Sequence, residues 1–201
     1  MAVLVIDTAT AACSIALIED GRCLGEAHEV VGRGHAERLL PMIRDLLGDR
    51  VPSEVLVDCG PGSFTGIRVG IAAARAFGLA WGVPVRGYSS LTLIAAGHAA
   101  GGAAAVAIIG GHGELFVQRF SAAPRRAVTE LASLRPEAAA EVVPEFRVLG
   151  SGAADLVAAR GFGEAVDALP RAADATLLSE DETALPPRPL YGRAPDAKAA
   201  A

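Results

Sequence analysis

The first third of the chain alternates short apolar runs with turns, in the pattern of strands that precede any helix. The run Ala2–Asp7 is apolar almost throughout and ends at an acid, which is typical of a buried strand. Further strands are predicted at Cys13–Asp20 and Cys23–Val30, since the Asp-Gly pair between them tolerates the positive φ of a tight hairpin turn. This order differs from a Rossmann domain, in which the first strand leads directly into a helix.

Two helices are predicted next, and their apolar positions suggest a docking surface. In Ala36–Leu47 leucines recur at helical spacing, and Pro41 should kink the helix or mark its first turn. Thr65–Trp81 is apolar nearly all round, so it has more apolar surface than one sheet face can bury. Small residues recur four apart along one of its sides. Packing against the chain's own sheet is the competing interpretation. The residues predicted to contact a partner chain are Leu39, Met42, Ile43, Gly70, Ala74 and Gly78.

The glycines and alanines of 101–105 mark a boundary between two lobes. Residues 1–101 form the first lobe, with five strands and the docking helices. Residues 102–201 form a smaller second lobe, which opens with two strands around a glycine turn and ends in an extended, proline-rich tail. The mixture of strands and helices places the chain in the α/β class.

The stretch Val57–Gly70, VDCGPGSFTGIRVG, joins a predicted strand to the second helix and raises the question of a ligand site. It lacks the lysine of a Walker loop, is one residue too long for a dinucleotide-binding fingerprint, and holds its serine in the wrong register for a hydrolase elbow. Pairing of Cys59 with His35 as a thiol nucleophile is less favoured than a buried structural cysteine. We therefore interpret the loop as a structural turn.

Candidate metal ligands give a weak signal. The four histidines fall in four different segments, without zinc-binding spacing. Asp7 and Asp58, each at the end of a predicted strand, could meet at one edge of a sheet and hold Mg²⁺. Acids that begin loops and cap helices are the favoured interpretation, and no metal site is predicted.

Composition and charge narrow the choice of partners. The net charge is −5 with no basic stripe, and aromatic residues make up 4%, which argues against direct binding of RNA. Neither a signal peptide nor a membrane span is visible, and three cysteines without C-x-x-C spacing indicate reduced thiols. A cytoplasmic protein without membrane contact is expected.

Five stretches of the chain carry a family resemblance: LVIDTATAACSIALIEDG, GHAERLLPMI, CGPGSFTGIRVGIAAARAFG, VPVRGYSSLTLIA and PLYGRAPDAK. Together they closely resemble the bacterial TsaB family, also called YeaZ, most densely over residues 3 to 97. The resemblance implies an actin/Hsp70/sugar-kinase (ASKHA) fold, with a mixed five-stranded sheet in each of two lobes and a reduced second lobe. It also implies that Asp7 and Thr8 stand at a degenerate nucleotide cleft, with no cofactor of the chain's own.

The resemblance further implies the role of a non-catalytic partner, or scaffold, subunit. Such a chain forms a heterodimer with the catalytic subunit TsaD and works with a TsaE-like ATPase, with ATP or ADP in the complex. The assembly attaches threonylcarbamoyl to adenosine 37 of tRNAs reading codons that begin with A, and this subunit contacts tRNA only indirectly. Alone, the chain would form a homodimer through its docking helices.

An enzyme is the alternative: a glycoprotease-like peptidase or a stand-alone ATPase. Either needs an activated nucleophile, a metal-bound water or a phosphate-binding lysine, and none can be placed in this sequence.

Two departures from the family pattern concern the second lobe. Ile109–His112 stand where relatives often carry an acid, and the tail reads Tyr191-Gly192-Arg193 in place of Tyr-Leu-Arg.

Overall fold

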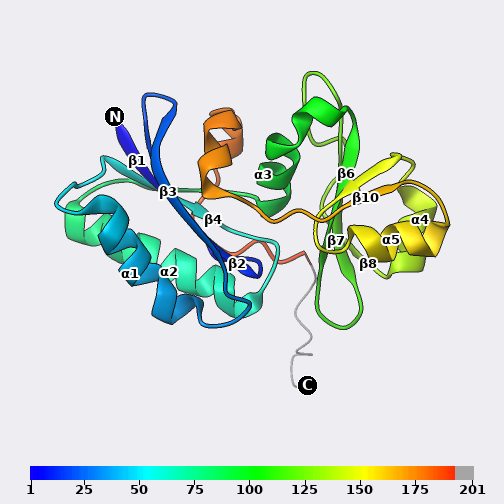
Figure 1. The fold of residues 1–201 in the computed structure, drawn as a ribbon, viewed down its shortest axis with the longest axis horizontal. Coiled ribbons are helices and arrows are strands. Elements are labelled where there is room, and N and C mark those ends of the chain that lie inside the picture. The colour runs from blue at the N-terminus through cyan, green and yellow to red at the C-terminus, as the bar shows by residue number, and fades with distance from the viewer. Residues whose placement is uncertain (193–201) are drawn as a thin grey trace, which may run out of the picture.

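The computed structural model describes residues 1–192, which form two lobes with one mixed five-stranded sheet each (Figure 1). In the first sheet the strand order is β3-β2-β1-β4-β5, with β1 antiparallel to β2 and parallel to β4. The strands of this sheet are β1 Ala2–Asp7, β2 Ala12–Glu19, β3 Arg22–Val30, β4 Glu54–Asp58 and β5 Val85–Tyr88. The predicted opening of three strands is confirmed.

The second sheet repeats this arrangement in the order β10-β9-β6-β7-β8. Its first strand is again central, antiparallel to the next strand and parallel to the fourth. The strands are β6 Ala104–Ile109, β7 Leu115–Phe120, β8 Ala132–Leu134, β9 Arg147–Leu149 and β10 Glu164–Val166. The prediction of two α/β lobes built on mixed five-stranded sheets is confirmed.

Helices cover the outer faces of both sheets (Figure 1). The helices α1 and α2 lie on the first sheet, α4 and α5 on the second, and α3 lies between the lobes. Their bounds are α1 His35–Leu47, α2 Phe64–Trp81, α3 Ser90–Gly97, α4 Pro136–Val142 and α5 Ala153–Arg160, with 3₁₀ turns η1 Ala99–Gly101, η2 Ala172–Leu177 and η3 Asp181–Thr183. Within residues 1–192, no helix is long and apolar enough to cross a membrane.

Local sequence explains where the two long helices begin and end. The side chain of Ser63 accepts a hydrogen bond from Gly66 N and caps α2, and Gly82 ends that helix in the left-handed conformation. Gly48 ends α1. Pro41 lies in the interior of α1, so the option that it marks the first turn is wrong.

Much of the chain between Ala172 and Leu190 packs on the first lobe, contrary to its predicted place in the second. Ala172 and Ala175 of η2 pack against Val5 and Ala16 of the first sheet. Further on, the backbone of Leu185 exchanges hydrogen bonds with Gly87 on β5. The tail is extended there, as predicted, but it returns across the molecule because its apolar residues find cover on the first sheet.

Candidate functional site

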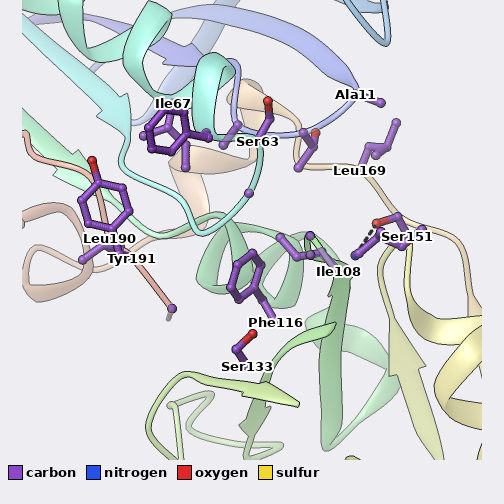
Figure 2. Close-up of a pocket in the computed structure, with 18 of the residues that line it drawn as sticks. Ala11, Ser63, Ile67, Ile108, Phe116, Ser133, Ser151, Leu169, Leu190 and Tyr191 are labelled. Atoms are coloured by element: carbon purple, nitrogen blue, oxygen red, sulfur yellow. Dashed lines mark hydrogen bonds between the residues drawn. The ribbon is translucent and has the colours of Figure 1, made fainter. Parts of the chain in front are cut away.

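A cleft of about 920 Å³ opens between the lobes (Figure 2). Its walls come from the turn after β1, the start of α2, the β6–β7 turn, and the last described residues. Apolar side chains dominate the lining, among them Ile67, Ile108, Phe116 and Leu169. Such a cavity favours apolar or flat ligand surfaces over a solvated, highly charged one.

One cluster of side chains at the mouth of this cleft combines a cation with two aromatic rings. The Arg68 guanidinium carbon lies 3.3 Å from the ring centroid of Phe64, and Arg68 donates a hydrogen bond of 2.9 Å to Tyr191 Oη. Phe64 and Tyr191 are both largely exposed. No Asp or Glu is among the cleft-lining residues of 1–192, so the part of the cleft that is described presents no carboxylate for a nucleotide's magnesium ion.

The glycine loop before α2 packs on the turn that follows β1. Ser63 N donates to Ala9 O over 2.6 Å, and Thr8 Oγ1 donates to Gly66 O over 2.7 Å. A Cβ atom at Gly62 would overlap Ala9 O, and one at Gly66 would overlap Thr8 O. The glycines are required here because two backbone segments touch.

Asp7 and Thr8 are buried and are not among the residues that line the cleft. Asp7 is 0% exposed and Thr8 2% exposed, and the lining begins at Ala9. The structure thus encloses both side chains, and their contact with a cofactor stays a prediction. The structure does bring Asp7 next to Asp58, as their positions at strand ends suggested, but no group of three His, Cys, Asp or Glu in the described chain could hold a metal ion.

Cys59 and His35 do not form the nucleophilic pair that was the less favoured alternative. Burial raises the pKa of Cys59 to about 12, so the thiolate is disfavoured. His35 Nε2 instead lies 2.9 Å from Thr10 O and 3.2 Å from Ala12 O, in the β1–β2 connection. The surroundings of both side chains therefore indicate structural roles.

The six residues predicted to contact a partner all face the interior of the chain. Leu39, Met42, Ile43 and Ala74 belong to the core between the helices and the first sheet. Added Cβ atoms at Gly70 and Gly78 would meet side chains of this sheet or its loops. The small-residue stripe lets α2 lie close to its own sheet, so the competing interpretation is correct for these positions.

Other residues of α1 and α2 form an exposed apolar surface, which we call the outer helix face. Leu40 of α1 is 54% exposed. Phe77 stacks on Trp81 with ring centroids 4.5 Å apart, and the two rings line a groove of about 520 Å³ between the helices. The sequence showed an excess of apolar positions in these helices, but it did not identify which residues face outward.

The repeated sheet topology defines the class of protein: a two-lobed α/β protein of the actin-like fold. A crystal structure from Pseudomonas aeruginosa, described as an uncharacterized protein with similarity to peptidase YEAZ, matches with a TM-score of 0.81 and 31% identity. The match covers 96% of this chain and 99% of that chain. Residues 25–158 match the family model TsaD: tRNA N6-adenosine threonylcarbamoyltransferase. The chain belongs to the TsaB/YeaZ family.

Curated relatives match over part of their length. The tRNA threonylcarbamoyladenosine biosynthesis protein TsaB of Escherichia coli K12 is 43% identical over 103 residues, which are 48% of this chain and 44% of that protein. A tRNA N6-adenosine threonylcarbamoyltransferase of Corynebacterium diphtheriae is 31% identical over 160 residues, or 71% of this chain and 44% of that one. The matched region thus spans less than half of each of these relatives.

Proposed function

We propose that this chain is a non-catalytic subunit of the system that makes threonylcarbamoyladenosine in tRNA, and that it pairs with a TsaD-like threonylcarbamoyltransferase. The observation that carries the proposal is membership of the TsaB/YeaZ family over 96% of the chain. The E. coli relative is named for this pathway, and the matching family model is named for the transferase. The modified nucleoside is adenosine 37 of tRNAs that read codons beginning with A.

The state of the nucleophilic side chains supports a non-catalytic role. The Cys59 thiol is buried and its pKa is raised to about 12, and Ser63 is engaged as the cap of α2. Acyl transfer needs a nucleophile with an adjacent base, or a metal-bound water. Neither Cys59 nor Ser63 has such a partner, because the Cys59 thiol donates to backbone carbonyls and Ser63 Oγ accepts from Gly66 N. Chemistry in the complex is therefore assigned to the partner.

The composition of the cleft supports the absence of a nucleotide cofactor of the chain's own. Arg68 could meet a phosphate, but no acid of the described lining could hold the accompanying Mg²⁺. We assign the ATP or ADP of the complex to the TsaD-like and TsaE-like partners. The net charge of −5 likewise assigns most of the contact with tRNA to them.

The outer helix face is the surface proposed for the TsaD-like partner. Leu40 of α1 is exposed, and together with the Phe77–Trp81 stack of α2 it lines a groove between the two helices. Exposed aromatic and aliphatic residues gathered in this way are typical of protein–protein interfaces. Without that partner, the same face would pair with a second copy of the chain.

Leu40→Arg tests this surface, because the side chain lines the groove, is 54% exposed, and its replacement should leave the fold intact. We expect the variant to bind the TsaD-like partner at least about tenfold more weakly, since a central apolar contact typically contributes more than 1 kcal/mol. Val142→Arg, at an exposed apolar position on the second lobe, is the matched control and should bind normally. Equal affinities of the two variants would place the interface elsewhere.

The enzyme alternative is tested with the purified chain alone. We expect no peptidase or ATPase turnover above a blank. Turnover that disappears in Cys59→Ala or Asp7→Asn, with the fold retained, would favour the alternative, whereas turnover that persists in both would indicate a contaminant.

A further inference from the structure

Two aspartates meet inside the first lobe, at the carboxyl ends of neighbouring parallel strands. Asp7 ends β1 and Asp58 ends β4, and the register that pairs Ile6 with Val57 brings the two acids side by side. The two side chains are 0% and 1% exposed, and each carboxyl group influences the pKa of the other. The pair is sealed from the water that would stabilise two negative charges.

The neighbouring elements present hydroxyl groups to this pair. From β5, Tyr88 Oη lies 3.0 Å from Asp7 Oδ2. From the start of α3, Ser90 Oγ lies 2.6 Å from Asp58 Oδ2, while Gly60 N donates to Asp58 Oδ1 over 2.7 Å. All three partners are neutral.

The remaining nearby titratable groups also fail to neutralise the pair. Cys13 on β2 and Cys59 beyond β4 are buried thiols that interact with the aspartates and have raised pKa values. The side of α2 that faces the sheet carries glycine and isoleucine, and its Arg75 instead donates to Pro187 O. None of the ion pairs found within residues 1–192 includes Asp7 or Asp58.

The hydroxyl groups of Tyr88 and Ser90 carry fewer hydrogens than there are oxygen–oxygen contacts in this cluster. Tyr88 Oη is also within reach of a β1 carbonyl, and Ser90 Oγ is 2.9 Å from Pro61 O. Each hydroxyl carries one hydrogen and so serves one of its two neighbours. Asp7 Oδ1 is buried without any hydrogen-bond partner. A proton on Asp7, donated to Asp58, supplies the missing hydrogen.

We propose that Asp7 and Asp58 share one proton at neutral pH, held on Asp7, and that this proton fastens the first sheet to the junction between the lobes. Asp58 holds Ser90, the first residue of α3, and Leu91 of α3 packs in the core of the second lobe. Ionisation of both acids would place two buried negative charges side by side at this junction. The pair is thus a pH-sensitive clamp.

The sign of the pH effect follows from the surroundings. Burial, then the negative charge of Asp58, raises the pKa of Asp7 well above its usual range, and burial raises the pKa of Asp58 to about 6. An unfolded aspartate has a pKa of about 3.9, so the folded chain keeps protons that the unfolded chain has lost. The stability contributed by these protons is complete below about pH 4 and is lost as the pH rises through the folded pKa values.

Infrared spectroscopy of the full chain tests the proton directly, because a protonated carboxyl group has its own C=O stretching band. We expect this band in the wild type at neutral pH and its loss in Asp7→Asn, whose amide keeps the shape and can still donate to Asp58. Asp49→Asn, at an exposed position, is the matched control and should keep the band. A wild-type spectrum without the band would overturn the proposal.

Denaturant unfolding tests the link to stability. Between about pH 5 and about pH 8, the unfolding midpoint should fall in the wild type and in Asp49→Asn, and fall less than half as far in Asp7→Asn. An equal fall in all three proteins would overturn the clamp. If Asp7→Asn does not fold, the infrared band of the wild type decides the question. Loss of this band at alkaline pH together with the fall in the unfolding midpoint supports the clamp. Persistence of the band while the midpoint falls overturns the clamp.

Discussion

The two lobes share one strand order but differ in how much structure each builds on it. In the first, α1 and α2 have 13 and 18 residues and the strands have 4 to 9. In the second, three of the five strands have 3 residues, and α4 and α5 have 7 and 8. The acid pair and the outer helix face belong to the larger lobe, while the smaller one supplies a wall of the cleft. Shared topology therefore does not imply a shared role.

The loops between the fourth strand and the following helix show what the lobes do have in common. In the first lobe Ser63 N donates to Ala9 O, and in the second Gly152 N donates to Ala107 O over 2.9 Å. Added Cβ atoms at Gly62 and Gly150 would overlap the carbonyl oxygens of Ala9 and Ala107 respectively. Glycine-rich backbone at this point is a packing requirement of the repeated fold, which supports the interpretation of a structural turn.

Substitution of these glycines should cause the largest losses of stability, and in both lobes alike. Gly62→Val and Gly150→Val each force two backbone segments apart, so we expect losses of at least about 3 kcal/mol in the free energy of unfolding, or failure to fold. Gly111→Val, in the β6–β7 turn where a Cβ atom meets nothing within 4 Å, is the control and should change it by less than about 1 kcal/mol. Denaturant unfolding measures all three. A stable Gly62→Val variant would contradict the structural role of the loop.

The second contrast lies within one helix, between the side of α2 that faces the sheet and its outer side. Ala74→Arg places a charge in the core, where Ala74 is 0% exposed, and should cost about 3 to 5 kcal/mol of stability. Ala76→Arg, at an exposed position two residues further along the helix, should change stability by less than about 0.5 kcal/mol. Thermal unfolding distinguishes them. Similar stabilities of the two variants would mean that α2 is oriented differently.

Much of the first lobe could be predicted because each local signal agreed with the tertiary structure. Ala2–Asp7 and the Asp-Gly hairpin have unambiguous patterns, and both are found as predicted. The outward side of α2 could not be predicted, because a helix that is apolar nearly all round has no polar face to mark the solvent. A stripe such as Gly70, Ala74 and Gly78 fits close approach to a sheet as well as to another helix.

The second lobe and the tail were harder to predict for a different reason. Strands such as Ala132–Leu134 and Glu164–Val166 are too short to show any alternation, and tertiary pairing alone fixes them. The return of Leu185 to the edge of β5 is a contact across almost a hundred residues, which no local pattern encodes. The acid pair was partly foreseeable, since strand ends predicted its position, but its hydrogen-bonding partners Tyr88 and Ser90 come from β5 and α3.

The smallest expected effect concerns Gly192, the residue at which the tail reaches from the first lobe to the second. Leu190 N donates to Cys59 O in the first lobe, while a Cβ atom at Gly192 would lie 2.6 Å from the ring of Phe116 on β7. The departure from the family's Tyr-Leu-Arg pattern thus coincides with a close contact between tail and second lobe. Gly192→Leu must displace the Phe116 ring.

Because Phe116 is only partly buried, its ring can move, and we expect Gly192→Leu to lower the free energy of unfolding by about 1 kcal/mol. The double variant Gly192→Leu with Phe116→Ala should show that the two losses are not additive, since the second change removes the obstacle. Tyr191→Phe, which removes the exposed hydrogen bond to Arg68, is the control and should act independently of Phe116. Strict additivity of Gly192→Leu and Phe116→Ala would mean that the tail does not rest on the second lobe in solution.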